Sequence, residues 1–272
     1  MIADVVLASG DSCHFESSAH CGFPAPGPEI FVFDTWFSIG PFEVTKPAFL
    51  AVVACAVICA FFWAAFSKAK LVPNRIQSVG ELGYLFVRDQ IARPMVGAKG
   101  DKFVPYFLAM FVFIWLLNFM AFIPLAQFPV TSRIAFPALF ALVAWVIYMY
   151  LTFKNNGLVG GFRNLAVPSG LPWWVYIILT PIELLSNIII RPFTLTIRLF
   201  ANMFAGHLLI AVFSVAAWYL VSPTVVGMAS SAASFTMAIV MTAFELLIQF
   251  LQAFIFTMLV AGYIGQAYEE AH

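Results

Sequence analysis

Residues 199–244 read LFANMFAGHLLIAVFSVAAWYLVSPTVVGMASSAASFTMAIVMTAF and contain no Asp, Glu, Lys or Arg. About 20 apolar residues cross the hydrocarbon core of a bilayer as a helix, so this stretch is long enough for two crossings. Other charge-free runs occupy 47–67, 103–132, 134–153, 164–182 and 246–268. Because these runs are continuous rather than alternating, they favour helices over a β-barrel. The sequence therefore predicts an all-α integral membrane protein.

The composition of the whole chain excludes most other classes. Its 272 residues include 13 Lys+Arg and 13 Asp+Glu, and 63% are hydrophobic. An ordinary soluble domain carries charge on roughly a quarter of its residues. The low charge excludes a cytosolic enzyme and a disordered chain, and the absence of a basic excess excludes nucleic acid as a partner.

The placement of the charges predicts the orientation in the membrane. Residues 1–45 contain six acids and no base, whereas residues 68–102 contain seven bases and three acids. Because basic loops stay in the cytoplasm, we expect the N-terminus outside and the C-terminus, after five crossings, inside. We interpret 1–45 as an extracytoplasmic segment without the features of a signal peptide, and 46–272 as a single membrane domain.

Four helices are expected in the first part of that domain. Spanning helices are predicted at about 47–66, 103–124 and 134–153. Residues 74–93 place apolar side chains at helical spacing between polar ones, which predicts an amphipathic helix. Such a helix either lies on the cytoplasmic membrane surface or packs on protein.

The last hundred residues form two unusually long apolar stretches, 173–220 and 224–268. Each stretch is either a pair of upright helices or one long, strongly tilted helix. The second reading is favoured because 199–222 offers no cluster of turn residues. We therefore expect two long antiparallel helices with a kink near Pro192, where an N–H group is missing. The total is about five membrane-embedded helices and one amphipathic surface helix.

Five ionisable residues lie within these long helices. A charge at membrane depth is costly and usually marks a transport pathway or a pairing site, although any single one can be a structural ion pair. Five such residues on two neighbouring helices, with polar amides close to them in sequence, argue against a purely structural role for all of them. The five residues are Glu183, Arg191, Arg198, His207 and Glu245.

Helical spacing separates the charges of the first long helix. Arg191, Thr194, Arg198 and Asn202 recur every three or four residues and share one face. His207 comes nine residues after Arg198, and nine steps of about 100° place it on the opposite face. Arginine is a fixed charge, whereas histidine exchanges protons near neutral pH.

The second long helix carries one polar stripe made of Glu245, Gln249 and Gln252, spaced four and three residues apart. Glu245 could share a hydrogen bond with His207 if the two helices face each other. Polar groups on two faces suit two separate water-accessible routes with a charge barrier between them.

These residues resemble a known family. The run RLFANMFAGH at 198–207 and the run LQAFIF at 251–256 are similar to the signatures of subunit a of bacterial F-type ATP synthases. The resemblance implies a non-catalytic stator subunit in the bacterial plasma membrane, which provides two offset proton half-channels beside a ring of c subunits. It also implies contact with the b subunits of the peripheral stalk, with the remaining synthase subunits and with lipid. No cofactor or metal is expected.

The resemblance also implies roles for individual residues. Arg198 matches the arginine between the half-channels and would face the c-ring, with Asn202 and Gln252 near that face. His207 and Glu245 match a Glu and His pair of many relatives, in exchanged order, and are assigned to the outer half-channel. Asn118 matches an Asn of the second spanning helix, and Ala121 stands where many relatives have Asp.

The cytoplasmic route is assigned in the same way. Arg191 matches a basic residue of the family, and Glu183 resembles an acidic one, although its spacing to Arg191 is one residue longer than in some relatives. Ser186 and Asn187 are companions of this route or polar residues of helix packing.

Two other functions fit the intramembrane Arg, His and Glu. A secondary transporter would show an internal repeat and broken helices in both halves, which this sequence lacks. A membrane enzyme would need a metal-binding pair of histidines or a nucleotide loop, and neither motif is present, so ATP hydrolysis by this chain is not expected.

Two local features leave alternatives open. Cys13 and Cys21 form a disulfide, form a two-Cys, two-His metal site with their neighbouring histidines, or remain as thiols. The small residues 229–234, ASSAAS, allow close helix packing or line a pore, and packing is favoured.

Overall fold

A computed structural model of the chain describes residues 23, 25–31, 35–39, 42–67, 70–123, 126, 128–166 and 173–268. Five of the described helical stretches are long and apolar enough to cross a membrane. This number confirms the predicted all-α membrane class. The alternatives for Cys13 and Cys21 lie outside the described residues and remain predictions.

The contacts divide the chain into two compact units. Unit 1 comprises the described residues of Met1–Ala51, Leu117–Arg133 and Ala201–Phe250. Unit 2 comprises those of Val52–Leu116, Ile134–Phe200 and Leu251–His272. Each unit is described by itself below. The single membrane domain expected for 46–272 remains a prediction.

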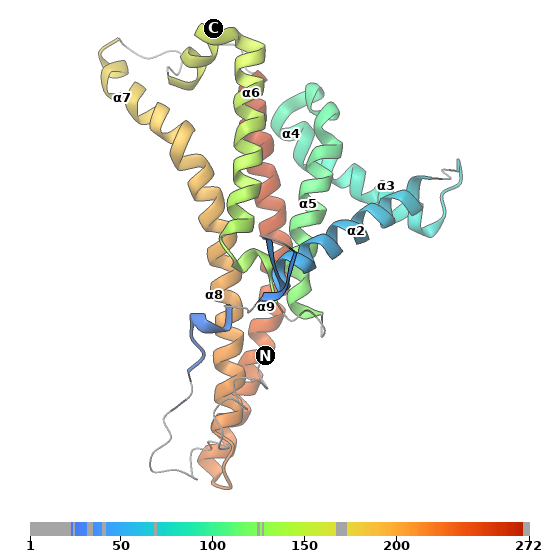
Figure 1. Ribbon diagram of the computed structural model, residues 1–272, viewed down its shortest axis with the longest axis vertical. Helices are drawn as coiled ribbons and strands as arrows, with labels where there is room; N and C mark the ends of the chain where they lie inside the picture. The colour runs from blue at the N-terminus through green and yellow to red at the C-terminus, as the bar shows by residue number, and fades with distance from the viewer. Residues whose placement is uncertain are drawn as a thin grey trace. The chain divides into compact units, whose positions relative to one another are not determined.

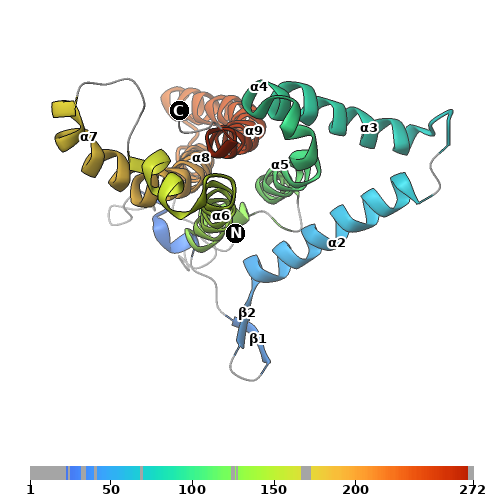
Figure 2. The ribbon, with the colours of Figure 1, turned by 90° about the horizontal axis from the view of Figure 1, so that it is seen from above.

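A short β-hairpin precedes the first spanning helix and was not predicted. A 3-10 turn at Pro28–Phe31 is followed by β1, Thr35–Ile39, and β2, Phe42–Thr45, which pair antiparallel with Ser38 opposite Glu43. Both strands are rich in aromatic and β-branched residues, which favour extended structure. Figure 2 shows β2 leading directly into α2.

The first spanning helix and the amphipathic helix form at the predicted places. The former is α2, Lys46–Phe66. The latter consists of α3, Arg75–Val87, a π-helical turn at Arg88–Ala92, and α4, Arg93–Val96. Within unit 2, a Cβ atom at Gly80 of α3 would lie 3.2 Å from the ring of Phe66, so the two helices pack closely. The opposite face of α3 exposes apolar side chains, and its position on the membrane surface remains a prediction.

The next two spanning helices are also confirmed, with different ends. A 3-10 segment, Gly97–Phe103, leads into α5, Val104–Phe119, and a 3-10 turn at Met120–Phe122 follows. Another 3-10 turn, Val130–Ser132, precedes α6, Ala135–Ala166. Gly157 interrupts α6 with a φ of 69°, a left-handed conformation that glycine adopts without strain. The predicted end at residue 153 is therefore too early by about one turn.

The last hundred residues form long helices, as expected. The first run comprises α7, Trp173–Leu185, a π-helical turn at Ser186–Ile190, and α8, Arg191–Tyr219. The second is α9, Val225–Tyr268. Figure 1 shows the unit 1 parts of α8 and α9 side by side and antiparallel, and the Ser231 hydroxyl donates to the Ala217 carbonyl at 2.6 Å between them. This bond supports packing as the role of the small residues 229–234, whereas the tilt in the membrane stays a prediction.

Both π-helical turns have the same local cause. Each is followed by Arg-Pro, at Arg93-Pro94 and at Arg191-Pro192. The N–H group of Arg93 donates to the carbonyl of Arg88, and that of Arg191 donates to the carbonyl of Ser186, five residues back in each case. Because proline has no N–H group, the usual ladder cannot continue through it, and a wider turn forms instead. At the place where a kink near Pro192 was expected, the structure has the π-helical turn Ser186–Ile190.

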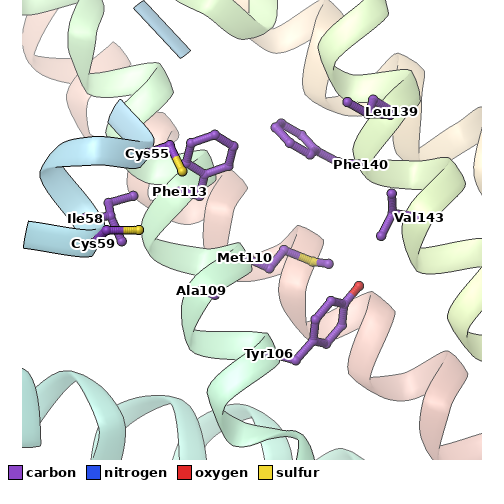
Figure 3. Close-up of a pocket in the computed structure, with 10 residues that line it drawn as sticks. All are labelled: Cys55, Ile58, Cys59, Tyr106, Ala109, Met110, Phe113, Leu139, Phe140 and Val143. Atoms are coloured by element: carbon purple, nitrogen blue, oxygen red, sulfur yellow. The ribbon is translucent and has the colours of Figure 1, made fainter. Parts of the chain in front are cut away.

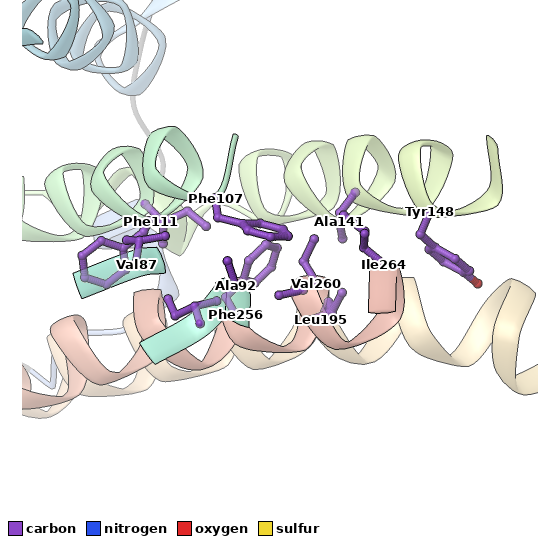
Figure 4. Close-up of a cluster of buried hydrophobic side chains, with 14 of the residues drawn as sticks. Val87, Ala92, Phe107, Phe111, Ala141, Tyr148, Leu195, Phe256, Val260 and Ile264 are labelled. Atoms are coloured by element: carbon purple, nitrogen blue, oxygen red, sulfur yellow. The ribbon is translucent and has the colours of Figure 1, made fainter. Parts of the chain in front are cut away.

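The core of unit 2 brings these helices together. Figure 4 shows apolar side chains from helices far apart in the sequence meeting in one cluster. Each contributing helix buries residues at helical spacing, as expected for helices that pack along one face. The labelled members are Val87, Ala92, Phe107, Phe111, Ala141, Tyr148, Leu195, Phe256, Val260 and Ile264.

Candidate functional site

The polar stripe of α9 is buried, as a functional stripe would be. Glu245 is 3% exposed, Gln249 0% and Gln252 2%. Among the described residues, neither carboxylate oxygen of Glu245 has a hydrogen-bond partner, and neither do the side-chain amide atoms of Gln249. Leaving polar groups buried without partners is unfavourable, so these side chains are candidates for a functional role.

Gly206 brings α8 close to the Glu245 carboxyl group within unit 1. A Cβ atom at Gly206 would lie 3.3 Å from Glu245 Cδ and 3.5 Å from Glu245 Oε1. The adjacent residue, His207, is half-buried, with its ring edge-on to Phe31 at 6.0 Å. The suggested hydrogen bond between His207 and Glu245 is not formed among the described residues. The Glu245 carboxyl group nevertheless lies against Gly206, the residue that precedes His207 in α8.

Arg198 lies on an exposed face of α8 in unit 2. Leu195 and Leu199 are buried on the other side of the helix, whereas Thr194 and Arg198 are exposed. Asn202, one turn further along the same helix, is also exposed. No ion pair involves Arg198 in the described part of the chain. The predicted common face of Thr194, Arg198 and Asn202 is therefore exposed, and it carries the positive charge of Arg198.

Arg191 has a different environment from Arg198, although both belong to unit 2. Its Nη1 donates to Gln266 Oε1 at 2.7 Å, and its guanidinium carbon lies 4.7 Å from the ring centroid of Tyr263. Both partners belong to the C-terminal end of α9. Arg191 thus joins the start of α8 to the end of α9, through a hydrogen bond and a cation–π contact.

Asn187 is buried beside α6 in the same unit. Its side-chain N–H donates to the Leu165 carbonyl at 2.7 Å, and its backbone carbonyl accepts a hydrogen bond from the Tyr148 hydroxyl. The Asn187 side-chain oxygen has no partner among the described residues. Glu183 and Ser186, on the preceding turn, are half-buried. The contact with Tyr148 could not be predicted from sequence patterns, because it joins residues 39 positions apart.

Asn118 lies at the end of α5, in unit 1. It is fully buried, and its side-chain oxygen accepts a hydrogen bond from the Thr131 hydroxyl. Thr131 is also fully buried. The side-chain amide nitrogen of Asn118 has no partner in the part of the chain that the structure describes. Asn118 therefore has a local structural partner for its oxygen, and the two N–H donors of its amide stay unused among the described residues.

The apolar cavity of unit 2 holds none of these residues. Figure 3 shows it between α2, α5 and α6, with a volume of about 420 Å³. Both thiols of α2, Cys55 and Cys59, line it, together with Tyr106, Met110 and Phe140 among others. Its lining is almost entirely hydrocarbon, so it offers no chemistry for an ion.

Fold and site together define a class: a predominantly helical, multi-pass membrane protein with an exposed arginine and a buried glutamate on its long helices. Comparison with known proteins specifies the family. The family model described as ATP synthase A chain matches residues 48–265. The chain belongs to the ATP synthase A chain family, and thus to the proton-translocating, non-catalytic stator subunits of F-type ATP synthases.

Individual relatives cover almost the whole chain. ATP synthase subunit a of Streptomyces lividans is 45% identical over 270 residues, which is 98% of this chain and 95% of that protein. The subunit a of Frankia alni is 46% identical, over 90% of this chain and 86% of that protein. The subunit a of a Nocardioides species is 40% identical, over 92% and 95%. Other synthase subunits are therefore partners of this chain.

Proposed function

We propose that this chain provides two offset proton routes, separated by Arg198, and couples proton flow to rotation of a c-ring. The observation that carries this proposal is the guanidinium of Arg198, which is exposed and forms no ion pair with any residue that the structure describes. A cation on an apolar membrane-facing surface is costly unless a partner covers it. A ring of subunits with a membrane carboxylate is a partner of the required charge.

The strength of that attraction suits a motor. Two opposite charges about 4 Å apart attract by about 4 kcal/mol at an effective dielectric constant near 20. The membrane potential supplies about 2.3 kcal/mol per charge per 100 mV. The two energies are comparable, so Arg198 would hold a deprotonated ring carboxylate back without trapping it. A carboxylate would pass only after it has been protonated from the other route.

We assign the outer route to the buried polar groups of unit 1. Glu245, which lies against Gly206, and His207, the next residue of α8, are the proton-exchanging groups, and Gln249 lies one turn further along α9. Buried side chains without partners are suited to bind water and pass protons. Asn118, on α5, is assigned to the same route. Asn202 and Gln252 are assigned to the surface that faces the c-ring.

The inner route is assigned to Glu183, Ser186, Asn187 and Arg191, all in unit 2. The half-buried Glu183 supplies a carboxylate on the cytoplasmic side, and Arg191 fixes the helix ends that surround it. We further propose that the chain lies in a bacterial plasma membrane with its N-terminus outside. The positive charge of residues 68–102 supports this orientation. Subunits b of the peripheral stalk complete the set of neighbours.

Cross-linking in the assembled synthase tests which face of α8 meets the ring. Ile197→Cys on the exposed face should form a disulfide with a cysteine placed next to the ring carboxylate of subunit c. Leu199→Cys, on the buried face, is the matched control and should not. A ring cross-link to position 199 with none to position 197 would refute the proposed interface.

A further inference from the structure

The π-helical turn Ser186–Ile190 leaves one backbone carbonyl in need of a donor. In a regular helix the carbonyl of Asn187 would accept from the N–H of Arg191, four residues on. Here the N–H of Arg191 donates to Ser186 instead. In a π-helical pattern the donor would come from residue 192, which is proline and has none.

The Tyr148 hydroxyl supplies the missing donor. It donates to the carbonyl of Asn187, while the Asn187 side chain donates to the carbonyl of Leu165. Both of these partners belong to α6, so that helix holds the turn at two points. Tyr148 itself is only 3% exposed, and Figure 4 shows its ring at one end of the buried cluster, with the hydroxyl oxygen at the outer end of the side chain. No water can readily replace such a donor.

The turn also sets the direction in which Glu183 points. Glu183 and Arg191 are eight residues apart, and eight regular helical steps of about 100° would place them about 80° apart around the axis. A π-helical turn absorbs one residue, and the seven remaining steps place them about 20° apart. The turn therefore aligns the carboxylate of Glu183 with the guanidinium of Arg191.

The exposed stripe of this helical run shows the same extra residue. Up to Leu185, exposed apolar residues recur every three to four positions. The next step, from Leu185 to the pair Ile189 and Ile190, is four to five residues, which is the length of a π-helical turn. The exposed apolar residues on this stripe are Ile178, Ile182, Leu185, Ile189, Ile190, Phe193 and Ile197.

We propose that Tyr148 is a positioning residue of the inner proton route: its hydroxyl stabilises the π-helical turn, and that turn aligns Glu183 with Arg191. This inference rests on the proposed function. Three separate observations within unit 2 support it. The carbonyl of Asn187 has no backbone donor, the Tyr148 hydroxyl of α6 donates to it, and the exposed stripe shifts by one residue. A second π-helical turn, Arg88–Ala92, also precedes an Arg-Pro pair, at Arg93-Pro94.

The first experiment replaces Tyr148 in the complete synthase. In inverted vesicles, Tyr148→Phe should lower ATP-driven proton pumping per assembled complex by roughly tenfold, because a buried carbonyl loses its only donor. Tyr150→Phe is the matched control on the same helix, since Tyr150 is exposed, and it should pump normally. Pumping by Tyr148→Phe at the wild-type rate would overturn the inference.

A second substitution provides a rescue that a general packing role does not predict. Pro192→Ala restores a backbone N–H at the position from which Asn187 can accept in a π-helical turn. In the double variant Tyr148→Phe, Pro192→Ala, the carbonyl of Asn187 again has a backbone donor, so any assembly lost in Tyr148→Phe should recover. Because the proline that favours the π-helical turn is gone, Glu183 and Arg191 return to regular helical spacing, about 80° apart, and pumping should stay low. Full recovery of pumping in the double variant would overturn the inference.

A length change tests the alignment itself. Deletion of Ile189 leaves seven regular steps between Glu183 and Arg191 and keeps them aligned, whereas insertion of one alanine after Ile189 separates them by about 80°. The deletion should retain more pumping than the insertion, and the reverse order would contradict the proposed alignment. Arg198→Ala, measured beside these variants, distinguishes a failure of the proposed function from a failure of the inference about Tyr148. Normal pumping by Arg198→Ala defeats the proposed function, whereas a defect there with none in Tyr148→Phe defeats only this inference.

Discussion

At the scale of single residues, the position of the Glu245 carboxyl group depends on a glycine. Gly206 is the residue of α8 against which that group lies, and a side chain there would approach Glu245 Cδ to 3.3 Å. This distance is shorter than ordinary van der Waals contact. With a Cβ atom at position 206, the carboxyl group would have to move by a few tenths of an ångström.

Gly206→Ala should therefore impair proton transport. Crowding of a well-packed site typically costs about 1–3 kcal/mol, so ATP-driven pumping should fall by roughly tenfold while the complex still assembles. Glu245→Asp in the same chain shortens the crowding side chain and should restore part of the activity. Normal pumping by Gly206→Ala alone would show that the site has more room than the structure gives it.

The exchanged order of His207 and Glu245 leads to a second prediction. If the two side chains serve one route, His207→Glu combined with Glu245→His should support more pumping than either single substitution, because both chemistries are kept. The measurement is the pumping rate of the three variants in inverted vesicles. A double variant no better than the worse single variant would show that the two groups act separately.

At the scale of helices, much of the architecture follows from the sequence. Charge-free runs predicted α2, α5 and α9 to within a few residues, because an apolar stretch in a membrane has few alternatives to a helix. Spacing also predicted that Glu245 shares one stripe with Gln249 and Gln252. It predicted that Arg198 shares one face with Thr194 and Asn202, but not that this face is exposed. Both are properties of single helices and need no tertiary information.

Other features could not be predicted from local patterns. The partner of the Asn187 carbonyl is Tyr148, on a different helix, and no periodicity links the two. The π-helical turn depends on a missing N–H two residues beyond its end, combined with a distant donor. The β-hairpin Thr35–Thr45 was missed because residues 1–45 were interpreted by their charges and not by the strand pattern of their aromatic and β-branched residues.

Two glycines of α9 predict how closely that helix packs in unit 2. A Cβ atom at Gly265 would lie 2.2 Å from the backbone oxygen of Met95, whereas one at Gly262 would meet only Met95 Sδ at 3.8 Å. Gly265→Ala should therefore destabilise the subunit by about 2–3 kcal/mol and reduce its amount in membranes. Gly262→Ala should be tolerated, since alanine favours a helix. Equal amounts of both variants would contradict the packing of α9 against Met95.

At the scale of the whole molecule, the balance of 13 basic and 13 acidic residues conceals a strong asymmetry. Residues 1–45 are purely acidic in their charges, and 68–102 are mainly basic. Near the end of the basic stretch, Arg93 donates to Asp101 from Nε and Nη2, at 3.1 Å each, and these hydrogen bonds lower the pKa of the Asp101 carboxyl. The remaining bases are left to set the orientation in the membrane.

Labelling of intact cells tests that orientation. In a chain whose four cysteines have been replaced, Gly27→Cys should react with a membrane-impermeant maleimide, because position 27 is predicted to lie outside and a Cβ atom there meets nothing within 4 Å. Lys99→Cys should react only in inverted vesicles. Labelling of position 99 in intact cells would reverse the predicted topology.

The central claim is that Arg198 separates the two proton routes and couples them to the ring. Its most direct test is ATP-driven proton pumping by complete synthase that carries Arg198→Ala, in inverted vesicles with matched amounts of assembled complex. The proposal predicts that pumping is abolished while the detached catalytic head still hydrolyses ATP. Pumping at the wild-type rate would contradict it.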